Sequence, residues 1–199
     1  MSHYFDNKQH VISDEIIVDV GLADVAFAMA TDRGVFSHGH LDTGTGLLLR
    51  EAPTPPTTGN LLDLGCGSGA IALTLALRCP DATVWAVDIN QRARALTAAN
   101  AERNGVNNIR VVSPEQVPAE VQFATIWSNP PIRIGKQALH ALLLDWLGRL
   151  ASDGQAILVV QKHLGAGSLQ QWLTGESYPT ERIASRAGFR LLSCHRMTV

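Results

Sequence analysis

Downstream of residue 59, short apolar runs alternate with longer segments in which apolar residues recur at helical spacing. Short apolar runs bounded by glycine or polar residues are typical of buried strands. Segments with Ala and Leu at i, i+3 and i+4 are typical of helices that bury one face. The expected strands are 60–64, 83–87, 109–112, 123–127 and 156–160, and the expected helices are 68–78, 91–103 and 136–150.

The segment 53–59 separates this region from an N-terminal block of about 50 residues. Its three prolines exclude a helix or a central strand. The regular alternation of strands and helices predicts an α/β fold, with a parallel sheet covered by helices on both faces. Because ligands of such sheets bind at the carboxyl ends of the strands, the residues directly after each strand are the candidates for function.

Composition narrows the class of protein. The chain has 199 residues, 46% of them hydrophobic and 17% charged, which predicts a globular fold. The net charge of −2 excludes nucleic-acid binding through bulk charge alone. Three cysteines without a C-x-x-C spacing argue against a disulfide framework or a cysteine-rich zinc site. With no signal peptide and no long apolar run, we expect a soluble, cytoplasmic protein that does not bind membranes.

The first candidate site is a glycine loop between the strand 60–64 and the helix that follows. It reads Asp63-Leu-Gly65-Cys-Gly67-Ser-Gly69. Glycines at this position let the backbone approach a ligand closely at a helix N-terminus. The spacing also fits the dinucleotide pattern G-x-G-x-x-A, which leaves a dehydrogenase as one alternative. A tight turn without a ligand is the other.

Two acidic residues separate the possible ligands. Asp88 ends the second strand, where a carboxylate can accept hydrogen bonds from both hydroxyls of a ribose. Asp63 lies two residues before the first glycine, and we expect its carboxylate to face the same crevice. A carboxylate there repels a pyrophosphate but attracts the ammonium and sulfonium groups of S-adenosylmethionine. The pair therefore favours S-adenosylmethionine over NAD.

The second candidate site follows the fourth strand and reads Ser128-Asn-Pro-Pro-Ile132. The two prolines fix two φ angles, and the segment falls at the carboxyl edge of the sheet beside the glycine loop. The side-chain oxygen of Asn129 and the carbonyl of Pro130 can accept the two N–H bonds of an amine, with Pro131 holding both in place. Acceptors so placed favour a pyramidal nitrogen whose lone pair points at the methyl group. Holding the reactants in line can supply about 7–11 kcal/mol, and stabilisation of the developing ammonium adds to it.

Together these segments resemble the class I S-adenosylmethionine-dependent methyltransferases. Within that class the chain is similar to the small methyltransferase domain group, which includes the guanine-N2 methyltransferases of small-subunit ribosomal RNA. The resemblance spans residues 19–199. The segments that carry it are 63–69, 87–90 and 128–132, together with 31–37, 41–45, 47–49, 100–105 and 159–162.

The resemblance implies a Rossmann-like sheet of seven strands, mostly parallel with an antiparallel last strand, and helices on both faces. A closing hairpin is expected within residues 186–197. Residues 1–199 are expected to form a single methyltransferase domain. In it, 1–52 is a lead-in segment that contributes to the substrate pocket, and 60–199 is the donor-binding and catalytic core.

The resemblance also implies roles for single residues. Glycine-loop residues would hold the methionine part of the donor, and strand-end residues would hold its ribose and adenine. Asn129, Pro130 and Pro131 would carry the catalysis, and Phe36 and Ile132 would lie near the target base. The donor-binding set is Asp63, Gly65, Gly67, Gly69, Asp88, Ile89, Glu115 and Asn129.

The expected activity is methyl transfer to an exocyclic nitrogen, most simply guanine N2 in ribosomal RNA. In the resembling families, adenine-N6 and glutamine methyltransferases tend to carry an aromatic residue where this chain has Ile132. Arg133 and Lys136 are candidates for phosphate contacts, or simply solvated side chains. No metal site is expected, because His38 and His40 lack a third ligand. The alternatives are a methyltransferase for a small molecule or a protein glutamine, and a non-catalytic donor- or RNA-binding module.

Overall fold

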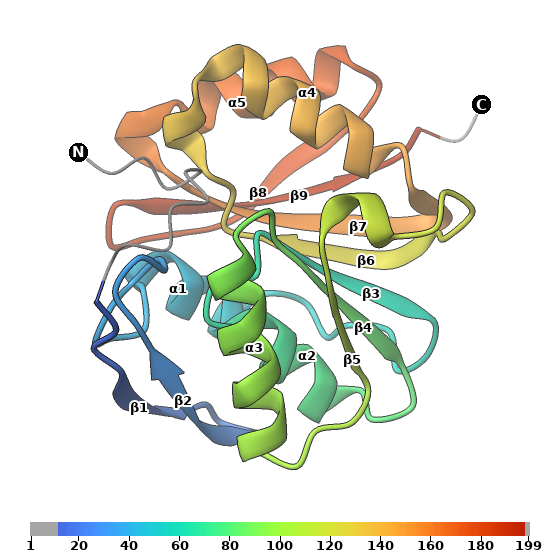
Figure 1. Ribbon diagram of the computed structural model, residues 1–199. Coiled ribbons are helices and arrows are strands. Elements are labelled where there is room, and N and C mark those ends of the chain that lie inside the picture. Colours follow the sequence, from blue (N-terminus) through green and yellow to red (C-terminus); the bar gives the residue numbers. More distant parts are fainter. Residues whose placement is uncertain (1–11, 198–199) are drawn as a thin grey trace.

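The computed structural model describes residues 12–197, and its centre is a seven-stranded sheet with helices on both faces (Figure 1). Residues 1–11 of the expected lead-in, and 198–199, lie outside the described part. The strand order is β5-β4-β3-β6-β7-β9-β8, and every pair is parallel except those that include β9. This confirms the Rossmann-like fold with an antiparallel last strand. The strands are β3 (Asn60–Leu64), β4 (Thr83–Val87), β5 (Ile109–Val112), β6 (Phe123–Ser128), β7 (Leu150–Gln161), β8 (Thr180–Arg186) and β9 (Phe189–His195).

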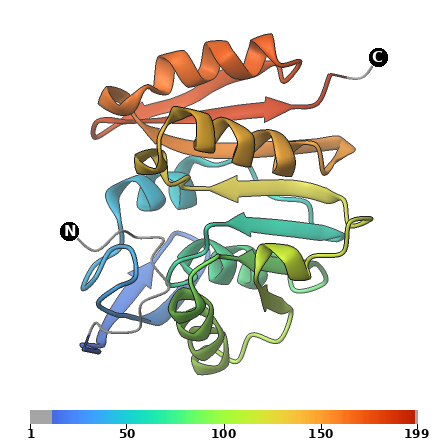
Figure 2. The ribbon, with the colours of Figure 1, turned by 45° about the horizontal axis from the view of Figure 1, so that its top comes forward.

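The helices divide between the two faces of the sheet, as Figures 1 and 2 show. On one face lie α1 (Thr43–Glu51), α2 (Ala70–Arg78) and α3 (Gln91–Arg103), and on the other lie α4 (Lys136–Leu147) and α5 (Ala166–Gly175). Because successive strand residues point to opposite faces, Leu61 packs in the core beneath α1 and α2 while Leu62 packs in the core beneath α4 and α5. Both are fully buried, which explains why the central strands have continuous apolar runs.

The closing hairpin lies partly upstream of where we expected it. Its turn is Ala187-Gly188, with φ angles of 48° and 82°. Two residues with positive φ are typical of the type I′ turns that join adjacent antiparallel strands. The expected range 186–197 therefore contains the turn and β9, whereas β8 precedes it. β8 is an edge strand with largely exposed side chains, so it lacks the apolar run by which the other strands are identified.

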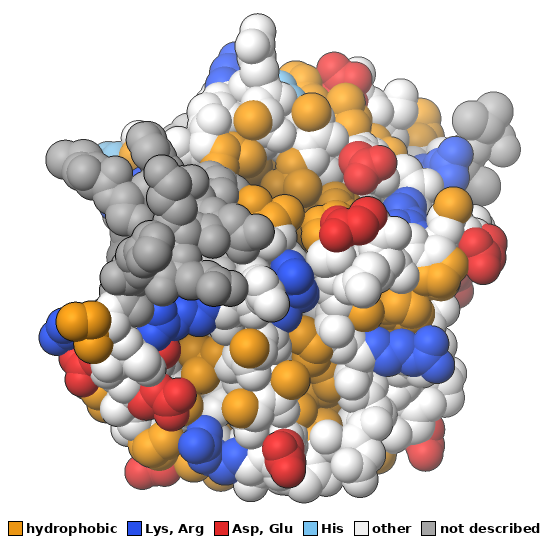
Figure 3. Space-filling view, viewed as in Figure 1, with side chains coloured by type: hydrophobic (Ala, Val, Ile, Leu, Met, Phe, Trp, Pro, Cys, Tyr) orange, Lys and Arg blue, Asp and Glu red, His pale blue; other side chains and the backbone are white. Residues whose placement is uncertain are grey.

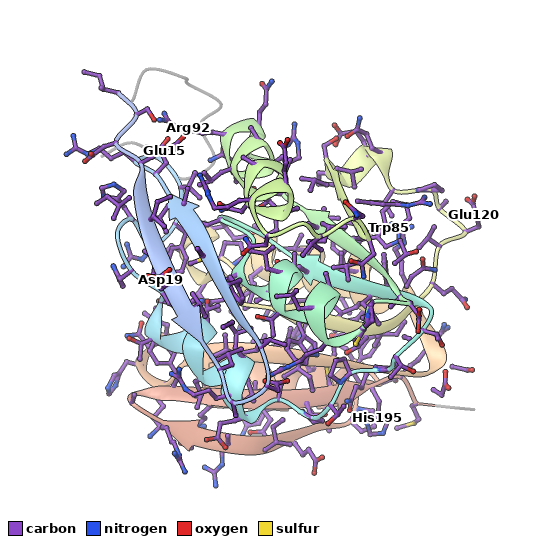
Figure 4. The ribbon with its side chains drawn as sticks, turned by 90° about the horizontal axis from the view of Figure 1, so that it is seen from below. Glu15, Asp19, Trp85, Arg92, Glu120 and His195 are labelled. Atoms are coloured by element: carbon purple, nitrogen blue, oxygen red, sulfur yellow. The ribbon has the colours of Figure 1, made fainter. Side chains whose placement is uncertain are left out.

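The N-terminal block contributes a separate two-stranded antiparallel sheet, β1 (Ile16–Gly21) and β2 (Ala26–Thr31), which packs against α3. Asp32 follows β2 and accepts hydrogen bonds from Arg92 of α3, at 2.6 Å from Nη2. Burial alone would raise the pKa of Asp32, but hydrogen bonds from the backbone of Asp14 and from Arg92 outweigh it, so its pKa is lowered. Figure 4 shows Arg92 at the end of α3 nearest this block.

Among residues 12–197, no helix is both long and apolar enough to cross a membrane.

Candidate active site

A cavity of about 660 Å³ opens at the carboxyl ends of β3, β4 and β6. Its volume lies within the range of small-molecule sites, roughly 300–1,000 Å³. Both candidate segments contribute to its wall, and so does the segment before α1. The lining includes Phe36, Asp42, Thr45, Gly65, Gly67, Asp88, Ile89, Asn129, Pro130, Pro131, Ile132, Arg133 and Phe189.

The glycine loop is held against β4 by its own backbone. The N–H groups of Gly65 and Cys66 donate to the carbonyl of Val87, at 2.8 and 3.1 Å. Gly65 and Gly67 have φ angles of +79° and +56°, a region that glycine enters without steric cost. The loop therefore presents backbone rather than side chains to the cavity.

Asp88 both shapes the loop and faces the cavity. Its Oδ2 accepts from Gly67 N at 3.0 Å, and its Oδ1 accepts from Asn90 N at 2.8 Å. Only 4% of the residue is exposed, and burial raises its pKa although both backbone hydrogen bonds oppose the shift. Each carboxylate oxygen keeps a further lone pair, so two hydroxyl groups of a ligand can still donate to it.

Asp63 lies behind the loop rather than in the cavity wall. The residue is fully buried, and its Oδ2 accepts from Ala72 N at 2.9 Å. Its Oδ1 has no hydrogen-bond partner among the described residues. Burial raises the pKa of Asp63 to about 8, and the nearby charge of Asp88 adds to the shift. With its pKa raised to about 8, the Asp63 carboxyl holds a proton at neutral pH, and a cationic group bound on the other side of the loop would favour its ionised form.

Asn129 is half-buried, and its amide has a defined orientation. Nδ2 donates to Asp42 Oδ2 at 2.8 Å and to Thr45 Oγ1 at 3.0 Å. A carboxylate can only accept, so the nitrogen end must face Asp42. The oxygen end of Asn129 is thereby left to accept hydrogen bonds from a ligand in the cavity.

The two prolines after Asn129 build a tight turn. Pro131 has φ −74° and ψ 74°, and Ile132 N donates to the carbonyl of Pro130 at 2.8 Å. These values define an inverse γ-turn. The carbonyl of Pro130 has a second lone pair, so it can still accept an N–H bond from a ligand.

Several other expected residues reach the cavity. Phe36, Ile89, Ile132 and Arg133 line it, and Phe36 and Ile89 are each about half exposed at its mouth. Lys136 is exposed at the start of α4 and does not line the cavity.

Gly69 and Glu115 also lie outside the lining. Gly69 faces α3, where a Cβ atom would lie 2.9 Å from Thr97 Cγ2. The carboxylate of Glu115 accepts from Ser113 Oγ at 2.6 Å, which lowers its pKa, and its side chain is exposed. At that point Pro114 lines the cavity instead.

Three further residues line the cavity although no motif in the sequence predicts a role for them: Asp42, Thr45 and Phe189. The pattern Asp42-Thr-Gly-Thr45 does indicate a helix N-terminus, and Asp42 Oδ2 caps α1 by accepting from Thr45 N at 2.8 Å. Its contact with Asn129 joins residues 87 positions apart, so no local pattern could have revealed it.

Among residues 12–197, no three His, Cys, Asp or Glu side chains are placed to hold a metal ion.

Solved methyltransferases share this fold. The T. thermophilus 16S rRNA N2 methyltransferase, in complex with AdoMet and guanosine, aligns with a TM-score of 0.77 at 23% identity over 92% of this chain and 51% of that one. A precorrin-6y C5,15-methyltransferase from Geobacter metallireducens aligns with a TM-score of 0.65 at 12% identity, over 85% of this chain and 94% of that one. The architecture is therefore the Rossmann-like fold of methyltransferases.

The sequence comparisons narrow the class to a family. Residues 26–193 match the methyltransferase small domain. An uncharacterised Bacillus subtilis protein, YbxB, is 37% identical over 83% of this chain and 84% of its own length. A "Ribosomal RNA small subunit methyltransferase C" from Ectopseudomonas mendocina is 33% identical over 90% of this chain and 54% of its own length. The chain belongs to the methyltransferase small domain family and is an S-adenosylmethionine-dependent methyltransferase. It spans about half the length of its ribosomal RNA methyltransferase relatives.

Proposed function

We propose that this protein methylates the exocyclic N2 of a guanine in ribosomal RNA of the small subunit. The observation that carries the proposal is the orientation of Asn129, whose Nδ2 is bound by Asp42 and Thr45. Its oxygen and the carbonyl of Pro130 therefore offer two acceptors beside the glycine loop. An amino group that carries two N–H bonds is the ligand that this pair fits.

The donor would lie over residues 65–68. Its methionine part would contact the backbone of the loop, and its ammonium group would favour the ionised form of the buried Asp63 carboxyl behind that loop. The ribose hydroxyls would donate to Asp88, and the adenine would pack on Ile89. Glu115 would have to leave Ser113 to reach the adenine, so we assign that contact to Ile89 and Pro114. When bound, S-adenosylmethionine supplies a methyl group on a sulfonium, which is already a good leaving group.

The protein's contribution is then to position and stabilise the target amine. Asn129 Oδ1 and the Pro130 carbonyl accept its two N–H bonds and direct its lone pair toward the methyl group. As the nitrogen gains positive charge these hydrogen bonds strengthen, so they stabilise the transition state more than the bound substrate. The amine then loses its extra proton to water, and no strong general base is required.

The choice of guanine in ribosomal RNA rests on the relatives and on the mouth of the cavity. Relatives at 33% identity are named ribosomal RNA small subunit methyltransferases. Phe36, which can stack on a base, lines the cavity, and so do Ile132 and Arg133. Residues 1–52 would supply Phe36, Asp42 and Thr45 to the substrate pocket, while 60–199 would form the donor-binding and catalytic core.

The test uses small ribosomal subunits and naked 16S RNA from cells that lack the gene, with labelled S-adenosylmethionine and nucleoside mass spectrometry. N2-methylguanosine is the expected product. A methylated protein glutamine or a methylated small molecule from cell extract would overturn the assigned substrate. If neither the subunits, nor the naked 16S RNA, nor the cell extract is methylated, the protein would be a non-catalytic binding module.

A matched pair of variants tests the catalytic assignment. Removing one transition-state hydrogen-bond partner typically costs about 10²–10³ in kcat, so we expect that loss for Asn129→Ala. Because the proposed geometry assigns Asn129 Oδ1 to the target amine and not to the donor, as the donor-binding set had it, donor affinity measured by calorimetry should stay within twofold. Asn107→Ala, an exposed asparagine outside the cavity lining, is the control. Full turnover by Asn129→Ala would contradict the mechanism.

A further inference from the structure

The N-terminus of α1 lies against Asn129 of the core. Asp42 Oδ2 accepts two hydrogen bonds at once, from Thr45 N and from Asn129 Nδ2, both at 2.8 Å. Thr45 Oγ1 accepts a third, from Asn129 Nδ2 at 3.0 Å. The end of α1 is itself fixed, because Phe189 of β9 packs on Gly44 so closely that a Cβ atom there would lie 2.7 Å from the ring.

These contacts decide which end of the Asn129 amide faces the cavity. The oxygen and nitrogen ends of an amide have nearly the same shape, so packing alone does not distinguish them. The hydroxyl of Thr45 does not decide either, because it can donate or accept. Asp42 does decide. Its Oδ2 is bound to the first turn of α1, so it must be an acceptor, and the swapped amide would bring two oxygens together.

From this geometry we propose that Asp42 is a positioning residue for methyl transfer. Its carboxylate holds Asn129 with the oxygen toward the target amine, and thereby couples the capping of α1 to catalysis. The proposal rests on the proposed function, in which Asn129 Oδ1 accepts from that amine. It also gives the N-terminal block a role beyond enclosing substrate, because Asp42 of that block fixes the orientation of the Asn129 amide in the core.

Two substitutions separate capping from positioning. Serine is as good an N-cap as aspartate, but its shorter side chain cannot also reach Asn129. Asparagine keeps both functions, because the bond from Thr45 N holds its oxygen where Asp42 Oδ2 now lies. Asp42→Ser therefore removes the contact with Asn129 while α1 stays capped, and Asp42→Asn keeps it.

The experiment measures kcat, donor affinity and thermal stability for the full chain. Loss of a hydrogen bond to a charged group corresponds to a fall of about 10- to 100-fold in kcat, which we expect for Asp42→Ser. Its donor affinity should stay within twofold and its Tm within about 3 °C. Asp42→Asn should be at least fivefold more active than Asp42→Ser, and Asp19→Ser, an exposed residue on β1, serves as the control.

Three outcomes would overturn the positioning role: an active Asp42→Ser, equal losses in Asp42→Ser and Asp42→Asn, or a loss of activity that follows the loss of Tm. A background with Asn129→Ala isolates the proposal from the proposed function. There, Asp42→Ser should cost less than twofold further, because the side chain it orients is gone. If Asn129→Ala itself is fully active, the proposed function fails, whatever Asp42 does.

Discussion

The side-chain amide of Asn100 on α3 forms two hydrogen bonds with the backbone N–H and carbonyl groups of Ala30 on β2. Asn100 Oδ1 accepts from Ala30 N at 2.7 Å, and Asn100 Nδ2 donates to Ala30 O at 2.8 Å. Asn104, one helical turn later, pairs in the same way with Ala28, at 3.1 and 2.8 Å. Four helical residues rise about 6.0 Å and two strand residues span about 6.6 Å, so the spacings nearly match. Two asparagine side chains thus replace a neighbouring strand on the open edge of β2.

Replacing Asn100 should loosen the N-terminal block from the core. Asn100→Ala leaves the fully buried site with unpaired groups at Ala30 and at the carbonyl of Ser68, to which Nδ2 also donates at 2.9 Å. Each unsatisfied buried group costs about 1–3 kcal/mol, so the free energy of unfolding should fall by at least about 3 kcal/mol. Urea unfolding measures it, with Asn104→Ala as the comparison. Asn104 is half-exposed, water can replace its bonds, and a loss as large as that of Asn100→Ala would contradict this account.

Gly69 should be sensitive to substitution for two separable reasons. Its φ of +88° strains any side chain, and a Cβ atom would lie 2.9 Å from Thr97 Cγ2. Gly105 has a φ of +64° with nothing within 4 Å, so Gly105→Ala carries the strain alone, about 1–3 kcal/mol. Gly69→Ala should cost about 1–3 kcal/mol more, the usual price of overpacking. Adding Thr97→Ser removes the methyl group, although the hydroxyl would still lie 3.1 Å from the new Cβ atom, so it should recover part of that excess and none of the strain. Equal unfolding free energies for the two single variants would rule out the steric contribution.

The buried carboxyl of Asp63 predicts a dependence of stability on pH. Burial raises its pKa from 3.8 to about 8, so between these values the folded protein holds a proton that the unfolded chain has lost. The stability that this group contributes is therefore complete below about pH 4 and is lost as pH rises to about 8. The slope is at most about 1.4 kcal/mol per pH unit. Asp63→Asn removes it.

The measurement is urea unfolding of the wild type and of Asp63→Asn at several values between pH 5 and 8. The stability of the wild type relative to the variant should fall steadily as pH rises. The pKa of Asp88 is also raised by burial, but Asp88 is present in both proteins, so its contribution largely cancels in the difference. A difference that does not change with pH would show that Asp63 titrates normally.

The elements that could be predicted from the sequence are those marked by a pattern within a few consecutive residues. The expected strands 60–64, 83–87 and 109–112 coincide with β3, β4 and β5, because buried runs between glycine and polar residues are local patterns. The pattern of apolar residues predicts no helix or strand before residue 60. β1 is largely exposed, so it lacks the period of a buried strand. β2 is a short, alanine-rich apolar run, and periodicity alone does not distinguish such a run from a segment of buried helix. α5 was also missed, and α4 ends at Leu147 rather than 150 because β7 begins at Leu150.

The site divides in the same way. The glycine loop and the Asn-Pro-Pro segment are local motifs, and both line one cavity. The orientation of Asn129 depends on Asp42, and that contact exists only in the folded chain. Glu115 is the opposite case, a residue that the sequence pattern suggests but that does not line the cavity. It stands at the expected position after a strand, but Ser113 offers it a local hydrogen bond and the side chain stays outside the cavity lining.

Contacts to the RNA backbone should appear in the salt dependence of binding. The chain carries a net charge of −2, and Figure 3 shows acidic and basic side chains interspersed on the face in view. RNA affinity must then depend on a few basic side chains, for which Arg133 in the cavity lining and Lys136 at the start of α4 are the candidates. Each phosphate contact contributes about 0.7–0.9 to the slope of log K against log salt concentration. Arg133→Ala and Lys136→Ala should each lower that slope by this amount for 16S RNA, while Arg182→Ala, exposed on the edge strand β8, should leave it unchanged. An equal change in all three variants would mean that charge acts only at long range, and no change in the first two would remove both residues from the interface.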